Sequence, residues 1–361
     1  MEKLEEYPIT GKGVYIIINL DRHNFNGAWS GLEKLDYESD RKNLLSVFNL
    51  TDKPTNLLMA RNLTKEAGEG GFDYFMDNLK SSLIKKDEDN DDPSFVVFVL
   101  MSHGTTNGGF LLSTPADAES RVEPCNCSSN NHEAGTDCYM RFITRDVLEK
   151  LCKAYPSPIP KIVIIQTCRG TTRSTVAVGE ADCVIKGTEC AAPSDDELCD
   201  LKFADCFLLQ PCVESQGCWV SKDGTGSFLI GNFCYALRLL RYNAANLSKD
   251  ADKLLAIKGS TDGSHPIDKL VNHISSESFL NGWLTNICQH TALLASNVLI
   301  KEKSALGETP YDKQQPHFSS SLAYKLSCLK ILKTQWQDKD PYLAAWYDEM
   351  LKVEEESDED N

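Results

Sequence analysis

The sequence predicts an α/β protein with a mostly parallel sheet and helices on both faces. Residues 94–101 and 161–167 contain the continuous apolar runs 95–101 and 162–165, which are rich in β-branched side chains and too short for helices. Such runs are typical of parallel strands that are buried on both faces. Segments with helical spacing of apolar residues alternate with them, as expected when helices connect parallel strands.

The N-terminal elements follow the same alternation. Residues 13–20 form a first apolar run and predict a buried strand. Residues 36–50 and 72–84 have apolar side chains at helical spacing and predict helices that cover the sheet. The charged residues 85–92 then lead into the strand at 94–101.

The remaining elements are read from the same patterns. We expect helices over residues 145–155, 227–239 and 279–299 and strands over residues 203–209 and 317–326. Near the C-terminus, Leu343, Trp346, Tyr347, Met350 and Leu351 follow the spacing of an amphipathic helix. An acidic tail follows it at residues 354–361, and we expect the helix to dock on the protein's own surface.

Charge and composition exclude several classes of function. The 361 residues have a formal net charge of −16, which argues against binding to nucleic acid or to an anionic membrane. The first residues lack the apolar stretch of a secretory signal, and the 14 cysteines therefore predict reduced thiols in the cytoplasm.

Two of the predicted strands are each followed by a residue that could act in catalysis. His103 follows the strand at 94–101, and Cys168 follows the strand at 161–167. Since parallel strands place their carboxyl ends at one edge of a sheet, the two side chains predict a nucleophile and its base. Either residue alone is more often structural, so the pair carries the hypothesis.

The residues around the pair resemble the caspase family. Gln166-Thr167-Cys168-Arg169-Gly170 matches four of the five residues of the caspase signature. His103 lies 65 positions upstream of Cys168, against about 50 in that signature, and the extra residues fall in one insertion. Tyr7-Pro8 before the first strand and Gln314-Gln315-Pro316 before the last also resemble that family. The resemblance extends over residues 7–326 and implies a three-layer sandwich around a six-stranded, mostly parallel sheet.

The resemblance also implies how the chain is divided. Residues 1–173 correspond to a large subunit, 174–201 to the linker between subunits, 202–330 to a small subunit, and 331–361 to a C-terminal helix and tail. In caspases this linker is cut after aspartate, and the candidates here are Asp182, Asp195, Asp196 and Asp200. An acidic loop that is never cut fits these residues equally well.

The implied chemistry is peptide hydrolysis. His103 would act as general base and acid, and the N–H groups of Gly104 and Cys168 would form the oxyanion hole. The caspase pocket for aspartate uses two arginines and a glutamine, and here only Gln166 is retained. The corresponding positions carry Lys34 and either Trp219 or Ser221, with Lys222 beside them.

The first hypothesis is therefore a cysteine endopeptidase that acts on proteins, cleaves after aspartate in apoptosis or related signalling, and needs no cofactor. The short N-terminus implies the executioner type without a recruitment prodomain, as a homodimer or as a heterodimer with another caspase. The altered pocket keeps a second hypothesis open: a catalytically impaired homologue that acts as a decoy or dimerisation regulator. A third, zinc binding by an insertion, would use Cys125, Cys127, His132 and Cys138.

Overall fold

The computed structural model describes the chain in separate stretches, which hold a central sheet and helices on both of its faces. These stretches are residues 6–9, 12–25, 37–50, 56–84, 92–104, 109–116, 139–167, 203–212, 226–238, 241, 316–324 and 326–336.

Six strands of the described stretches form one sheet. Their spatial order is β2 (Leu57–Arg61), β1 (Gly13–Asn19), β3 (Phe95–Met101), β6 (Lys161–Gln166), β7 (Cys206–Gln210) and β8 (His317–Ser320). All neighbouring strands are parallel except β8, which pairs antiparallel with β7. Every residue of β1, β3 and β6 is buried, as expected for strands covered on both faces. The predicted fold class is confirmed.

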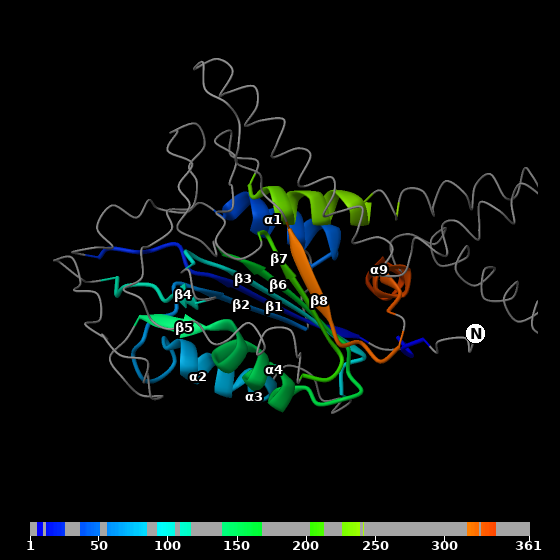
Figure 1. Cartoon of the computed structure of the whole chain (residues 1–361), viewed down its shortest axis with the longest axis horizontal. Helices are drawn as coiled ribbons and strands as arrows, with labels where there is room; N and C mark the ends of the chain where they lie inside the picture. Colours follow the sequence, from blue (N-terminus) through cyan, green and yellow to red (C-terminus); the bar gives the residue numbers. More distant parts are fainter. Residues whose placement is uncertain are drawn as a thin grey trace, which may run out of the picture.

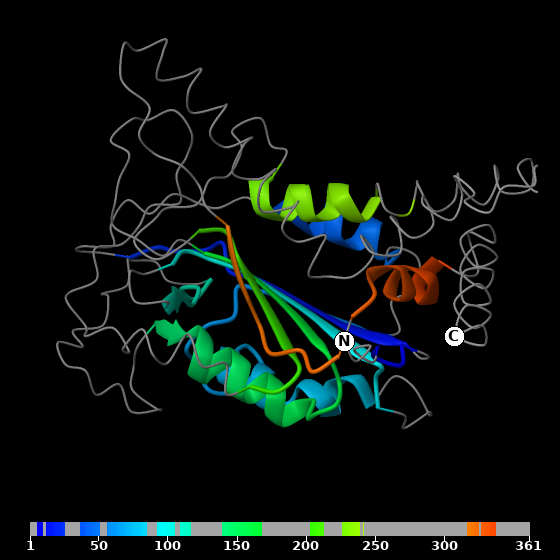
Figure 2. The same cartoon turned by 45° about the vertical axis from the view of Figure 1, so that its right-hand side comes forward.

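Two helical layers enclose this sheet. One face carries α1 (Glu38–Val47), the helix over residues 228–238 and α9 (Cys328–Trp336). The other face carries α2 (Phe72–Asp77), α3 (Leu79–Ile84), the π-helical turn η2 (Ile143–Leu148) and α4 (Glu149–Ala154). Figure 1 shows the two layers above and below the strands, and the rotated view in Figure 2 keeps the same arrangement.

The alternating side chains of the strands supply both cores. Tyr15 and Ile17 of β1 pack with α1, whereas Ile16 and Ile18 pack toward α2 and α4. This division follows from the period of two along a strand, which sends successive side chains to opposite faces. The apolar runs that predict buried strands therefore serve two cores at once.

Several element boundaries differ from those predicted. The single helix expected over residues 72–84 is divided into α2 and α3 at Asn78, whose amide donates to the Tyr74 carbonyl at 2.8 Å. Asparagine competes for backbone groups in this way and disfavours helix interiors. The strand expected over residues 317–326 ends at Ser320, and α9 begins eight residues later. Residues 279–299 and 343–351 lie outside the described residues.

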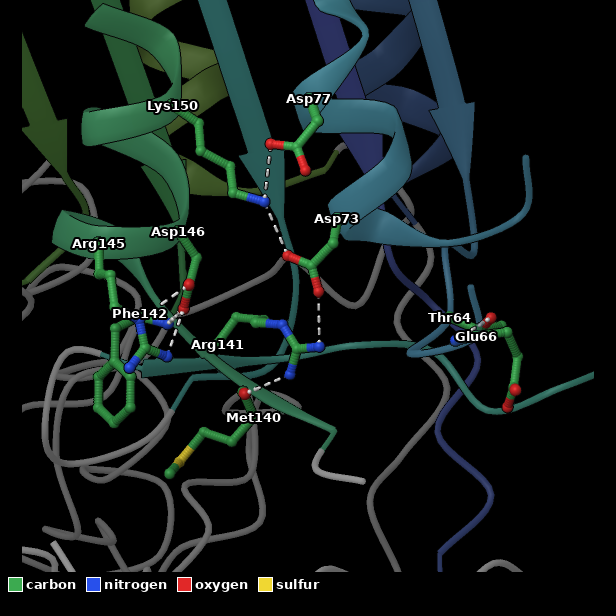
Figure 3. A network of polar contacts seen from close by, with 10 residues as sticks. All are labelled: Thr64, Glu66, Asp73, Asp77, Met140, Arg141, Phe142, Arg145, Asp146 and Lys150. Atoms are coloured by element: carbon green, nitrogen blue, oxygen red, sulfur yellow. Dashed lines mark hydrogen bonds and ion pairs between the residues drawn. The ribbon is translucent and has the colours of Figure 1, made fainter. Parts of the chain in front are cut away.

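A second, two-stranded antiparallel sheet consists of β4 (Gly109–Leu111) and β5 (Met140–Phe142). Arg141 of β5 is 10% exposed and pairs with Asp73 of α2 at 2.9 Å, and Lys150 of α4 reaches the same carboxylate at 2.9 Å. Figure 3 shows this carboxylate between the two cations. Partial burial acts to raise the pKa of Asp73, but the Lys150 hydrogen bond and the Arg141 charge outweigh it and lower the pKa. The network fastens β5 to α2 and α4.

Candidate active site

The carboxyl ends of β3 and β6 lie side by side. Met101 pairs with Gln166 in the register of the two strands, and the Ser102 N–H donates to the Gln166 carbonyl at 3.2 Å. His103 is thus two residues past the end of β3, and Cys168 is two residues past the end of β6. Thr167 is the last described residue of this segment, so Cys168 itself lies outside the described residues.

The turn that carries His103 is fixed by contacts with β4. The Leu111 N–H donates to the His103 carbonyl at 3.0 Å, and the Ser102 hydroxyl donates to the Leu111 carbonyl at 2.6 Å. Gly104 forms an antiparallel bridge with Phe110. His103 is fully buried. These bonds hold the backbone of the predicted base and oxyanion glycine against β4. The role of Ser102 in them could not be predicted from the sequence, because it depends on contact with β4.

A second histidine, which the sequence analysis did not identify, packs against His103. The rings of His23 and His103 are edge to face, with centroids 4.7 Å apart. His23 lies in the loop after β1, and this loop is held by Thr114, which accepts from the Asn24 N–H at 3.2 Å and donates its own N–H to the Arg22 carbonyl at 2.9 Å. The contact limits how the His103 ring can turn.

The surroundings of His23 favour its neutral form. Burial lowers the pKa of His23 well below its usual value, and repulsion from His103 lowers it further. The Leu111 backbone opposes this shift without reversing it. A neutral imidazole beside His103 adds no second positive charge to the site.

We expect the acid sensitivity of the fold to depend partly on His23. Because the folded-state pKa of His23 is lowered, the unfolded chain binds a proton first as the pH falls, and the free energy of unfolding decreases below about pH 6.5. His23→Phe keeps a ring but cannot be protonated, so its stability should decline less between about pH 6.5 and pH 5. Urea unfolding at both pH values measures this, and equal declines in the two proteins would contradict it.

The predicted specificity pocket is described in part. Gln166 is fully buried at the end of β6. The backbone carbonyl of Thr167 accepts a hydrogen bond from the Cys212 thiol at 4.0 Å. The other predicted pocket residues and the candidate processing sites lie outside the described residues; they are Lys34, Trp219, Ser221, Lys222, Asp182, Asp195, Asp196 and Asp200. Cys125, Cys127, His132 and Cys138 also lie outside them, so zinc binding there stays an untested alternative to the favoured interpretation, a surface insertion particular to this protein.

Asp40 is a positioning residue that the sequence analysis left without a role. It is fully buried in the first turn of α1, and both carboxylate oxygens accept the Ser227 N–H, at 2.9 and 3.0 Å. Gly226, directly before, has φ of +98°, and a Cβ there would meet the Asp40 carboxylate at 2.4 Å. The carboxylate thus fixes the start of helix 228–238, immediately after the segment predicted to form the specificity loop.

A cavity of about 460 Å³ opens between α1 and the ends of β1 and β2. Its two arginines are already paired, Arg41 with Glu38 at 2.6 Å and Arg61 with Asp21 at 2.5 Å. The hydrogen bond from Arg41 lowers the pKa of Glu38. The described lining of this cavity contains none of the predicted site residues.

Among the described helices, none is long and apolar enough to cross a membrane.

Comparison with known proteins agrees with this geometry. A family model of the caspase domain matches residues 74–326, well over half of the chain, and the match includes both His103 and Cys168. The chain belongs to the caspase family. Caspases are cysteine peptidases that act on protein substrates and form dimers, and the resemblance inferred from the signature residues is confirmed at this level.

A solved structure supports the caspase fold independently. The crystal structure of caspase-1 from Spodoptera frugiperda is similar to this chain with a TM-score of 0.51 and 16% sequence identity. The alignment covers 91% of this chain and 94% of the other. At this identity the likeness establishes the fold and says nothing of the substrate. Among curated proteins, no sequence matches the chain.

Proposed function

We propose that this caspase is an active cysteine endopeptidase with Cys168 as nucleophile and His103 as its base. The observation that supports it is the register of β3 and β6, which brings the two strand ends together with Met101 opposite Gln166. Adjacent strands are about 4.8 Å apart, and the Cα of Cys168 is about 3.8 Å from that of the buried Thr167. Such spacing suits contact between a thiol and an imidazole.

The reaction requires five steps from these residues. His103 takes the Cys168 proton, and the thiolate sulfur attacks the scissile carbonyl carbon. The N–H groups of Gly104 and Cys168 stabilise the negative oxygen, and Gly104 allows close approach because it lacks a side chain. His103 then protonates the departing amine, and it later activates the water that hydrolyses the thioester.

The proposed cleavage position is after aspartate, with weaker selectivity than a pocket of two arginines provides. Lys34 keeps a positive charge but lacks the planar fork that binds a carboxylate through two bonds. A lost charge-assisted hydrogen bond costs about 1.5–3 kcal/mol, which corresponds to about ten- to hundredfold in selectivity. Lys222 would supply the second charge if it faces the pocket.

A second candidate function rests on the same substitutions. Neither Trp219 nor Ser221 supplies the second pocket arginine, so the chain would act as a decoy or dimerisation regulator of an active caspase if substrate binding were lost. The catalytic pair is present under both proposals. Measuring substrate turnover therefore distinguishes the peptidase from the decoy, whereas the presence of His103 and Cys168 does not.

Assembly and processing complete the proposal. β8 is the last strand of the described sheet, and an edge strand of this kind suits pairing with the same strand of a second caspase. We propose a cytoplasmic zymogen that dimerises in this way. Cleavage of the linker over residues 174–201 would then mature it within apoptotic or related signalling.

The proposal is tested by hydrolysis of a peptide library varied at the residue before the scissile bond. Under reducing conditions, wild type should cleave, with aspartate preferred, and Cys168→Ala should not. Cys234→Ala is the matched control, because Cys234 is a buried cysteine of helix 228–238 and does not follow a strand end. A wild type that forms a dimer but cleaves no peptide would leave the decoy function in place of the peptidase.

A further inference from the structure

Two cysteines that the proposed reaction does not use face each other at the opposite edge of the sheet. The Sγ atoms of Cys152 in α4 and Cys206 at the start of β7 are 3.4 Å apart. Cys206 pairs with Lys161, the first residue of β6, whereas His103 follows the other end of the neighbouring strand β3. The thiol pair is therefore separate from the candidate active site.

The two thiols differ in access and in acidity. Cys206 is fully buried, whereas Cys152 is partly exposed. The pKa of Cys152 is lowered overall, mainly by the hydrogen bond from the Cys206 thiol and also by the charge of Lys161. Burial and the charge of Asp205 act to raise this pKa but are weaker in sum. The same hydrogen bond raises the pKa of Cys206, and burial of the Cys206 thiol raises it further. Cys152 is consequently the more acidic and the more accessible thiol of the pair, and Cys206 is its buried, less acidic neighbour.

The groups around the pair are fixed by their own contacts. Lys161 is fully buried, and its ammonium donates to the carbonyls of Ile159 at 2.6 Å and Ala204 at 3.4 Å. Asp205 accepts hydrogen bonds from Ser157 at 2.6 Å and from the hydroxyl of Tyr7. The cation is thereby held in place beside the dithiol.

Other described cysteines show the contrast. Cys234 and Cys328 are fully buried, and burial raises the pKa of both thiols, that of Cys328 to about 12. Such thiols are unreactive because they are neither ionised nor accessible. They serve as internal controls within the same molecule.

We propose that Cys152 and Cys206 form a peroxide-sensitive dithiol that closes reversibly to a disulfide. The Cys152 thiolate attacks one oxygen of hydrogen peroxide, the O–O bond breaks, and a sulfenic acid and hydroxide form. The Cys206 sulfur then attacks the Cys152 sulfur; the S–S bond forms, the S–O bond breaks, and the released hydroxide takes the Cys206 proton to give water. The two sulfurs lose two electrons, and the peroxide becomes one water and one hydroxide; the proton that Cys152 released on ionising converts this hydroxide to a second water.

Little movement is needed for this closure. A disulfide has its sulfurs about 2.05 Å apart, so the separation of 3.4 Å must shorten by a little more than an ångström. Small rotations about the side-chain bonds of two cysteines supply such a change.

The disulfide would join the two parts of the chain that the predicted linker separates. Cys152 precedes the linker and Cys206 follows it, so the bond would enclose residues 153–205, including the signature segment. After linker cleavage the two fragments would remain covalently attached while oxidised. The site depends on no peptidase activity, so it stands or fails independently of the proposed function.

Peptide mapping of the full-length wild-type protein tests the proposal. Reduced protein is treated with a few equivalents of hydrogen peroxide, alkylated in denaturant and digested with trypsin and chymotrypsin. Trypsin releases Leu151-Cys152-Lys153, and chymotryptic cuts after Phe203 and Phe207 separate Cys206 from Cys212 and Cys218. Most molecules should yield the Cys152–Cys206 linked peptide, which dithiothreitol removes. Cys234 and Cys328 should be alkylated equally with and without peroxide.

Variants and a cleaved form sharpen the test. Cys206→Ser should leave Cys152 as a sulfenic acid that dimedone traps, and Cys234→Ser should form the linked peptide as wild type does. A cut made within residues 174–201 by an added protease should give fragments that separate on a gel only after reduction. The proposal is overturned if wild-type Cys152 and Cys206 stay alkylatable, or if Cys152 is oxidised to sulfinic acid or bonds elsewhere instead.

Discussion

His103→Ala is expected to lower kcat/KM for peptide hydrolysis by about a thousandfold or more, because it removes the group that takes and returns the proton. Cys168→Ala should have an effect of similar size. The double variant should be no slower than the worse single variant, since nucleophile and base act as one unit. The measurement is the initial rate of cleavage of the best peptide of the library for the three variants and wild type.

The same experiment needs a check on folding, because His103 is fully buried and alanine leaves space in the turn. Rates are therefore normalised to the folded fraction, measured by urea unfolding. Losses that multiply in the double variant would mean that His103 and Cys168 act independently. A His103→Ala protein that folds and retains its rate would remove His103 from the mechanism.

Asp205→Asn is expected to lower the free energy of unfolding by about 2–4 kcal/mol at pH 7, because it removes a buried charge that accepts two hydrogen bonds. Asp205 is 2% exposed and accepts from Ser157 at 2.6 Å and from Tyr7, whose own hydroxyl accepts the Ala323 N–H at 2.9 Å. Its φ of 58° is tolerated by asparagine, so the variant isolates the loss of charge from backbone strain.

The pH dependence of this effect follows from the pKa of Asp205. Burial acts to raise that pKa, but the hydrogen bonds from Ser157 and Tyr7 outweigh it, and the net pKa is lowered. The carboxylate therefore stabilises the fold above the unfolded-state pKa of about 3.9, and the contribution is lost as the pH falls through the folded-state value. Wild type and Asp205→Asn should differ most at pH 7 and converge in acid.

Urea unfolding of both proteins at pH 7 and near pH 3 measures this, with Asp92→Asn as the matched control. Asp92 forms an exposed pair with Lys80 at 2.8 Å, and its loss should change stability by less than about 0.5 kcal/mol. If Asp205→Asn is as stable as wild type at pH 7, the charge of the Asp205 carboxylate does not stabilise the fold, and the prediction is wrong.

The parts of the fold that could be predicted are those with a strong local pattern. β3 is apolar along its whole length, and β1 and β6 are apolar over their central residues, so their runs are explained best as buried strands. β2 was not predicted because Leu57–Arg61 is a short edge strand, and its leucines, methionine and alanine favour helices in isolation. Its strand conformation comes from pairing with β1, which is a tertiary contact.

The candidate site divides in the same way. His103, Gly104 and Gln166 could be placed at strand ends because the motif and the strands adjoin in sequence. The contact of His23 with His103 depends on how the loop after β1 folds over β4, and no periodicity records it. Cys152 and Cys206 are likewise distant in sequence and meet only because α4 packs over the start of β7. Pairing of this kind is set by packing, which a single sequence does not display.

The rate at which iodoacetamide alkylates Cys168 at different pH values tests most directly whether His103 and Cys168 form a catalytic pair. In wild type the rate should stay high down to about pH 6, because the protonated imidazole stabilises the thiolate. In His103→Ala the rate should rise only as the pH approaches about 8.5, the pKa of an isolated cysteine. Coincident profiles for the two proteins would contradict the pair and, with it, the peptidase mechanism.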